Sequence, residues 1–220
     1  RIDSGSFREN IQKASEYIEK SSFSDRKNRA HGKGLLRGLG VGCFLETARG
    51  APQEGASITF TSTGRIELRV GTESNGQGHE TTFKQIASTR LGVPIKTLDY
   101  IQADTEQVSI GFGHGGARSM HMGAGTMALA IDSAIKKAAS VAAILLQTEE
   151  RELSFEKGLF STNMDERSIS IGEVALAARN PDIGTGFGEN GIDTFYKREE
   201  APFTFPNGCH AAEVEIDPDT

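Results

Sequence analysis

A strand-to-helix corner with two glycines around one glutamine constrains the fold of this chain more than any other feature. Gly76, Gln77 and Gly78 follow a strand-like alternation and lead directly into a helical pattern that should begin near His79 or Glu80. Glycines let a backbone approach a bound group closely, and the first N–H groups of a helix have no partner within the helix. Gln77 adds a donor and an acceptor on one planar amide. The corner therefore predicts a pocket for a polar, anionic cofactor, although a tight turn with an exposed glutamine also fits these residues.

A second glycine-rich segment, Gly111–Gly116, matches the pattern G-x-G-x-x-G. In a dinucleotide-binding fold this pattern follows a strand directly, opens a helix, and precedes an acidic residue by about 20 positions. Here the preceding strand should end near Ala103, and Asp132 lies inside a helical pattern instead of at a strand end. These mismatches disfavour NAD binding. A non-redox module that binds a nucleotide or another small molecule through this loop stays open as the alternative function.

The residues that follow this segment open a long alanine-rich helical pattern. Gly116 and Ala117 offer backbone donors, Ser119 suits a helix cap, and the guanidinium of Arg118 suits a phosphate or a carboxylate. Together they predict an anion site at the start of the helix. An ordinary capped helix, in which Arg118 pairs with Asp104 or Glu106, explains the same residues equally well.

Helical and strand-like patterns are intermixed along the chain, and a hairpin lies in its first third. Helices are expected at 7–20, 81–91, 120–148 and after the S-x-x-E capping box that begins at Ser170. Strands are expected at 35–46, 57–60, 65–70, 97–102 and 209–216, with a strand or hairpin at 153–160. The segments 21–34, 103–116 and 184–193 should be loops. This order predicts an α+β (mixed α/β) fold in which helices pack on a mixed sheet.

Composition and charge exclude several classes of protein. The net charge of −6 disfavours a nucleic-acid surface, and no apolar run approaches the roughly 20 residues of a membrane span. Cys43 lies in an apolar strand and should be buried, while Cys209 is far away in the sequence, so no disulfide framework is predicted and a reducing, cytoplasmic location is the simpler interpretation. No metal-ligand spacing is evident among the histidines, which are His31, His79, His114, His121 and His210.

Several segments in combination resemble the molybdenum-cofactor domain of the molybdenum hydroxylase large subunit. The two glycine loops have the order and separation seen in the xanthine dehydrogenase, aldehyde oxidase and carbon monoxide dehydrogenase family. Segment 3–7 resembles the family's Asp-Ser-Gly-Asp-Phe, and segment 37–46 resembles its Arg-Gly-x-Gly strand that ends in Glu. Segment 203–217, with Phe-Pro-Asn-Gly-Cys-His, is similar to the carbon monoxide dehydrogenase-like branch.

The resemblance implies roles for both loops. Gln77 would hydrogen-bond near the molybdenum or its dithiolene, with Gly76, Gly78 and His79 also at the cofactor. The second loop would receive the pterin or its phosphates through Gly116, Ala117, Arg118 and Ser119. The family usually has Gly-Ser-Arg-Ser at this place. Ala117 therefore removes one side-chain donor and leaves the backbone donors.

The resemblance also implies an oxidoreductase that hydroxylates or oxidises a small substrate, such as CO, an aldehyde or an N-heterocycle, with water as the oxygen source. Its cofactor would be molybdenum–molybdopterin in the cytosine dinucleotide form. The 2Fe-2S clusters and FAD would lie on partner subunits or domains of an oligomer. The family's general base is a glutamate in a Gly-x-Gly-Glu segment. Gly186–Glu189 matches that string but precedes the last strand, so Glu189 is not assigned and no catalytic residue is expected in this chain.

The domain organisation follows from these assignments. We expect residues 1–220 to be a fragment of the molybdopterin-binding domain, because an unpartnered strand pattern leads into Pro218 near the end of the chain. The composition allows two sub-domains, 1–150 and 151–220. The general-base glutamate is expected beyond Thr220, and the loop over the active site is also expected outside the fragment. The fragment alone should therefore be inactive.

Overall fold

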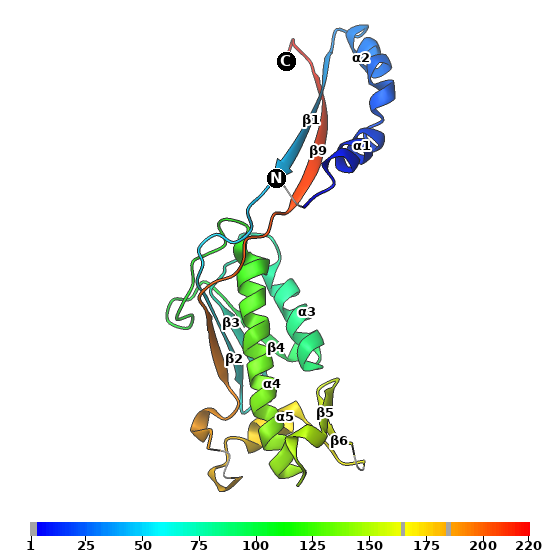
Figure 1. Ribbon diagram of the computed structural model, residues 1–220. Coiled ribbons are helices and arrows are strands. Elements are labelled where there is room, and N and C mark those ends of the chain that lie inside the picture. The colour runs from blue at the N-terminus through cyan, green and yellow to red at the C-terminus, as the bar shows by residue number, and fades with distance from the viewer. Residues whose placement is uncertain (1–3, 164–165, 184–185) are drawn as a thin grey trace. The chain divides into compact units, whose positions relative to one another are not determined.

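The computed structural model describes residues 4–163, 166–183 and 186–220, and its contacts divide the chain into two compact units. The first unit joins residues 1–48 to residues 203–220, and the second contains residues 49–202. The division therefore lies at residues 48/49 and 202/203 rather than near residue 150. Helices and strands are intermixed, as the sequence predicted (Figure 1).

In the first unit, a long antiparallel ribbon pairs β1 (Leu36–Leu45) with β9 (Asn207–Ile216) over their whole length. The helices α1 (Phe7–Tyr17) and α2 (Phe23–His31) pack against this ribbon (Figure 1). Helix α2 occupies most of the segment that was expected to be a surface loop, so that expectation was wrong. Arg26 of α2 donates to Glu213 of β9 at 2.6 Å and to the Ile18 carbonyl oxygen at 2.8 Å, and this tertiary anchor outweighs the polar composition of the segment.

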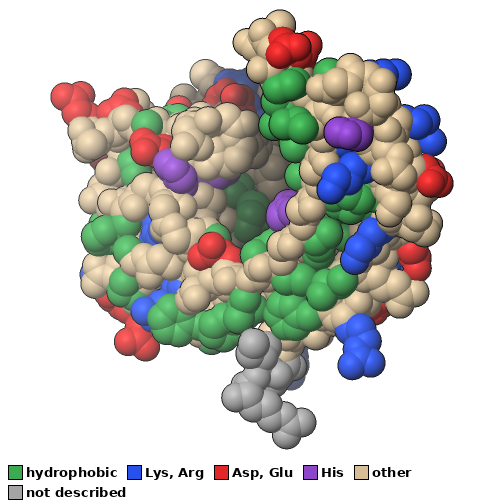
Figure 2. Space-filling model, turned by 90° about the horizontal axis from the view of Figure 1, so that it is seen from above, with side chains coloured by type: hydrophobic (Ala, Val, Ile, Leu, Met, Phe, Trp, Pro, Cys, Tyr) green, Lys and Arg blue, Asp and Glu red, His purple; other side chains and the backbone are tan. Residues whose placement is uncertain are grey.

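The ribbon is more exposed than its apolar sequence suggested. The expectation of a buried strand at 35–46 was wrong in this respect, because most of β1 is exposed, Cys43 included. Val41, Phe44 and Val214 are each at least 41% exposed, and Figure 2 shows hydrophobic side chains at the surface among charged ones.

The second unit is built on a four-stranded mixed sheet with the order β4-β3-β2-β8. Its strands are β2 (Glu54–Phe60), β3 (Ile66–Val70), β4 (Leu98–Ile101) and β8 (Thr194–Arg198). The pair β3–β4 is parallel and the other two pairs are antiparallel. The alternating burial of β2 and β3 places Ile58, Leu68 and Val70 in the core, as period-two patterning requires. The β2–β3 hairpin was predicted, and β8 was missed because its alternation is short.

Two long helices cover this sheet. Helix α3 (His79–Leu91) buries Phe83, Ala87 and Leu91 at a spacing of four, and α4 (Gly125–Leu145) buries a stripe of small and apolar side chains. A turn of π-helix, Ser119–Ala124, precedes α4. The helices therefore fix the positions of both glycine loops, since α3 starts directly after one and α4 follows the other (Figure 1).

A small subsheet completes the second unit. It contains β5 (Leu153–Glu156), β6 (Leu159–Thr162) and β7 (Ser168–Ser170), in that order. Helix α5 (Ile171–Ala177) follows, and its predicted capping box is present, because the Ser170 hydroxyl accepts from the Glu173 N–H while the Glu173 carboxylate accepts from the Ser170 N–H. Of the expected loop at 184–193, residues 184–185 lie outside the described part, and the rest holds a short 3₁₀ turn, Gly188–Asn190.

Candidate functional site

The first glycine loop forms an open corner between β3 and α3. Gly76 has φ +118° and Gly78 has φ +76°, a left-handed backbone that glycine adopts without strain. A Cβ added at either position would meet nothing within 4 Å. Gly78 is the N-cap of α3, so the first N–H groups of that helix lie at the same corner without a side-chain cap. The corner thus offers backbone donors beside free space.

Gln77, between these glycines, folds its side chain back over the loop. Its Oε1 accepts from the Asn75 N–H at 2.7 Å and from the Ser74 hydroxyl at 3.3 Å. Its Nε2 donates only a long bond of 3.5 Å, to the Glu73 carbonyl oxygen. The amide therefore holds the loop closed through its oxygen, and its two N–H donors are left nearly unused among the described residues.

The second glycine loop lies directly against the first. A Cβ on Gly71 would lie 2.2 Å from the Ile110 carbonyl oxygen and 2.4 Å from the Gly111 Cα, so the two backbones touch. Further along, Asn75 Nδ2 lies 3.1 Å from His114 Nε2. The structure therefore brings together two loops that the sequence analysis singled out separately. It also disfavours a phosphate cradle at Gly111, whose own Cβ position is occupied by Gly71 backbone at 2.5 Å.

Arg118 anchors the second loop instead of facing solvent. Its side chain is fully buried and its Nη1 donates to Glu54 Oε2 at 2.7 Å and to the Gly113 carbonyl oxygen at 2.8 Å. Its Nη2 donates to the carbonyl oxygens of Ala51 and Gln53. The expected pairing with Asp104 or Glu106 was wrong, and a guanidinium presented to an anion is also not what the structure shows.

Glu54, the partner of Arg118, was missed by the sequence analysis. It begins β2, is fully buried, and also accepts from the Gly55 N–H at 3.0 Å. Burial raises the pKa of Glu54, and the Arg118 charge and the hydrogen bonds to the carboxylate oppose that rise. No local pattern marks this glutamate, because its significance comes from Arg118, which lies 64 positions later.

The backbone between Gly116 and Ser119 is shaped by this anchor. Gly116 has φ +81° and Ala117 has φ +51°, and both residues are exposed. A Cβ on Gly116 would lie 2.7 Å from the Gly50 Cα, so glycine is required there. Ser119 does not cap the helix as expected; it is the first residue of the π-helical turn, and Arg118 occupies the N-cap position.

His79 and Thr72 carry buried polar atoms that lack partners. The His79 ring is 3% exposed and stacks on Phe83 with 5.1 Å between the ring centroids. Neither His79 nitrogen nor the Thr72 hydroxyl has a hydrogen-bond partner among the described residues. Burial, and secondarily His114, lower the pKa of His79, which is therefore neutral at pH 7 and has one donor and one acceptor to offer. Buried polar atoms without partners are uncommon in folded proteins, so these atoms are available to a polar ligand.

The two positions that bear on the general base lie at the surface. Glu189, which the sequence analysis left unassigned, is an exposed residue of the Gly188–Asn190 turn, and its carbonyl oxygen accepts from Arg179 at 2.7 Å. Thr220 is exposed and follows β9 in the first unit. The location of the base beyond Thr220 stays a prediction.

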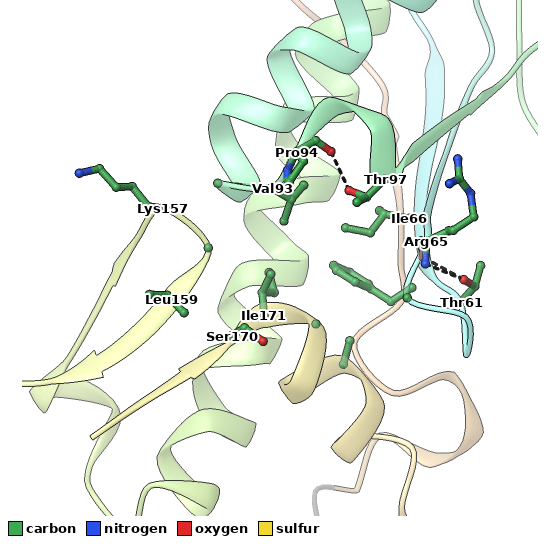
Figure 3. Close-up of a pocket in the computed structure, with 16 residues that line it drawn as sticks. Thr61, Arg65, Ile66, Val93, Pro94, Thr97, Lys157, Leu159, Ser170 and Ile171 are labelled. Carbon is green, nitrogen blue, oxygen red and sulfur yellow. Dashed lines mark hydrogen bonds between the residues drawn. The ribbon is translucent and has the colours of Figure 1, made fainter. Parts of the chain in front are cut away.

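Metal-binding clusters, membrane-spanning helices and other cavities were also sought in the described residues. In the described part of the chain, no group of His, Cys, Asp or Glu side chains could hold a metal ion, and no helix is long and apolar enough to cross a membrane. A cavity of about 280 Å³ lies between the Thr61–Ile66 turn, the Val93–Thr97 segment and the β5–β6 hairpin (Figure 3). None of the predicted site residues lines it.

Paired glycine loops at helix starts, buried polar atoms without partners and helices on a mixed sheet define a cofactor-binding domain. A sequence model described as "Molybdopterin cofactor-binding domain" matches residues 10–220, and the chain belongs to this family. The alternative of a nucleotide module at Gly111–Gly116 gains no support.

Individual relatives agree with this assignment. The chain is 30% identical to the nicotine 6-hydroxylase large subunit of Paenarthrobacter nicotinovorans, over 99% of this chain and 28% of the relative. It is 28% identical to the carbon monoxide dehydrogenase large chain of Afipia carboxidovorans, over 99% of this chain and 29% of the relative. Among solved structures, quinoline 2-oxidoreductase from Pseudomonas putida 86 superposes with a TM-score of 0.80 at 27% identity, over 97% of this chain and 29% of that one. The chain thus spans less than a third of the length of these relatives.

Proposed function

We propose that this chain supplies two cofactor-binding loops to a molybdenum hydroxylase that hydroxylates or oxidises a small substrate such as CO, an aldehyde or an N-heterocycle. The observation that supports it best is the open corner at Gly76 and Gly78, where helix N–H groups without a side-chain cap lie at the start of α3, together with the His79 ring nitrogens, which have no hydrogen-bond partner among the described residues. Relatives named carbon monoxide dehydrogenase large chain and nicotine 6-hydroxylase large subunit support the same class of reaction.

The residues fit a polar, anionic group such as the pterin with its phosphates. Gly76, Gln77, Gly78 and His79 would bind it with backbone donors, the free amide hydrogens and one imidazole nitrogen. Gly116, Ala117 and Ser119 would bind it with the exposed backbone of the second loop. Arg118 would contribute its backbone, while its buried side chain positions the loop. When bound, the cofactor supplies the redox-active molybdenum, and the loops orient it.

The wider assembly belongs to the same proposal. The cofactor would be the cytosine dinucleotide form of molybdopterin. Iron–sulfur and FAD subunits or domains would carry electrons away within an oligomer, and the enzyme would be cytoplasmic. The general base would come from a segment beyond Thr220, so this chain would bind and orient the cofactor without abstracting the proton.

Exchange of Gln77 for alanine in the full-length protein tests the proposal. Gln77→Ala should lower molybdenum content or turnover roughly 10- to 100-fold, the usual effect of losing a group that supports a metal site. Gln85→Ala is the matched control, because Gln85 is an exposed glutamine on α3, the helix that follows the loop. Elemental analysis and steady-state rates provide the measurements. Wild-type molybdenum content and rate in Gln77→Ala would contradict the assignment.

His79→Phe separates cofactor binding from folding. Phenylalanine keeps the stacking on Phe83 and removes two unpartnered buried nitrogens, so the free energy of unfolding of the cofactor-free protein should be unchanged or higher. Molybdenum content should nevertheless fall. If molybdenum content stays at the wild-type value in this variant, His79 is a core residue only.

A further inference from the structure

The two cysteines of the chain lie opposite each other on the β1–β9 ribbon of the first unit. The strands β1 and β9 run side by side (Figure 1), and their register pairs Cys43 directly with Cys209. Directly opposed residues of an antiparallel pair have Cα atoms about 4.5 or 5.5 Å apart and side chains on the same face. Both spacings fall within the range of about 4.4–6.8 Å that a disulfide spans. The sequence analysis predicted no disulfide because the fold, and not the sequence, brings these residues together.

Both thiols are free and face each other across the ribbon. Cys43 is exposed and Cys209 is partly exposed. Burial, and next a hydrogen bond with the Cys43 thiol, raise the pKa of the Cys209 thiol. The pair therefore consists of an accessible thiol on Cys43 and a second thiol on the residue directly opposite it in the ribbon.

Aromatic packing on the other face of the ribbon fixes this register. Phe44 stacks on His210 with 5.2 Å between the ring centroids and 21° between the planes. Its ring also covers Gly208, where a Cβ would lie 2.7 Å from the ring. A slip of one strand by one residue would break this stack and place the two cysteines on opposite faces of the ribbon. The thiols are consequently held opposed.

We propose that Cys43 and Cys209 form a reversible cross-strand disulfide, with a low-molecular-weight disulfide such as oxidised glutathione as the oxidant. The Cys43 thiolate attacks one sulfur of glutathione disulfide, and one glutathione leaves as a thiolate that takes up the proton. The Cys209 thiolate then attacks the Cys43 sulfur of the mixed disulfide and releases the second glutathione. The two cysteines are oxidised, one glutathione disulfide is reduced to two thiols, and no other reactant is required.

The bond would close a covalent ring that contains every residue of the second unit, because that unit runs from 49 to 202. It would also tie together a two-stranded ribbon, an arrangement that has little stability of its own. Exposed disulfides are the ones that a cell reduces and reforms readily. The pair is therefore suited to respond to oxidative conditions by stiffening the ribbon.

The experiment titrates the full-length protein with mixtures of reduced and oxidised glutathione. Mapping of non-reduced peptides should recover one peptide pair joined through Cys43 and Cys209, and dithiothreitol should separate it. Amide hydrogen exchange should slow in β1 and β9 on oxidation, while the sheet around Ile58 and Leu68 serves as the internal reference and should not change. Stable glutathione adducts on the separate cysteines, or crosslinks between two molecules, would overturn the proposal.

Two variants make the test specific to the geometry. Cys43→Ser should abolish both the joined peptide and the change in exchange. Cys43→Ser combined with Val41→Cys moves the thiol two positions along the same face, opposite Ala211, where only a diagonal approach to Cys209 of about 7–8 Å exists. This variant should not form the bond under the same mixtures. Equal bond formation in it would show that ribbon flexibility, and not the opposed register, produces the crosslink.

Discussion

Glu54→Gln tests whether the buried ion pair holds the second glycine loop. Glu54 and Arg118 are both fully buried, with 2.7 Å between Oε2 and Nη1. A Cβ on Gly71 would lie 2.2 Å from Glu54 Oε1, so protein backbone also packs closely against the carboxylate. The substitution keeps the size of the side chain and removes its negative charge, which leaves the Arg118 cation inside the protein.

The expected loss follows from what Arg118 retains. Removal of one partner of a buried ion pair typically costs about 3–5 kcal/mol, because the remaining charge is uncompensated. Arg118 keeps its bonds to the carbonyl oxygens of Gly113, Ala51 and Gln53, which offset part of that cost. We therefore expect a loss near the lower end, about 3 kcal/mol, or roughly a hundredfold in the unfolding equilibrium constant.

Urea denaturation of the purified chain measures this loss. The matched control is Asp132→Asn, which breaks the ion pair between Arg90 and Asp132. The distance in that pair is similar, 2.6 Å, but its side chains are 40% and 50% exposed, so the control should lose at most about 1 kcal/mol. A loss in Glu54→Gln no larger than in the control would refute the reasoning.

A double-mutant cycle with Arg118→Met identifies the origin of the loss. If the stranded cation causes it, Arg118→Met should cost less in the Glu54→Gln background than in the wild-type protein. Strictly additive losses would show that the two side chains stabilise the fold independently. In that case Arg118 positions its loop through the three carbonyl bonds alone.

Two further predictions concern packing and pH. Gly71→Ala should destabilise the protein by about 1–3 kcal/mol, because its Cβ would overlap the Ile110 carbonyl oxygen. Gly42→Ala is the control, because its Cβ would meet nothing within 4 Å. In the same denaturation assay, the control should change the free energy of unfolding by about 0.5 kcal/mol or less. The hydrogen bond from Arg26, with further help from Arg37, lowers the pKa of Glu213 from 4.5 to about 2. The stabilisation by Glu213 should thus be complete above pH 4.5 and disappear as the pH falls toward 2. The melting temperature of Glu213→Gln should therefore fall less steeply across this pH range than that of the wild-type protein. Identical slopes for the two proteins would contradict this assignment.

Local sequence signals predicted the elements that local chemistry determines. The capping box at Ser170, the β2–β3 hairpin and the start of α3 at His79 each depend on a few adjacent residues, and each is present. Helix α2 was missed because its stability comes from Arg26, whose partner Glu213 lies at the other end of the chain. A pattern of neighbours carries no information about such a contact.

For the candidate site too, features that depend on adjacent residues were predicted, and features that depend on long-range contacts were not. The glycine corner was predictable because left-handed backbone and a helix start both favour particular residue types at adjacent positions. The adjacent residues did not predict the burial of Arg118, since an arginine after Gly115, Gly116 and Ala117 suits an anion site as well as a buried anchor. Only the contact with Glu54 decides between these roles.

The buried anchor explains how the second loop can present backbone instead of side chains. Ala117 has a left-handed φ of +51°, which is unfavourable for a residue with a Cβ and persists only where the surroundings impose it. Gly116 is packed against Gly50 on one side, and Arg118 is fixed by four acceptors on the other. Ala117 is therefore held at the surface, while the carbonyl oxygen of Gly116 accepts from the Arg49 N–H at 3.2 Å. In the proposed function, recognition at this position would depend on backbone geometry, so alanine in place of the serine that the family usually has would remove one donor and preserve the presentation of the loop.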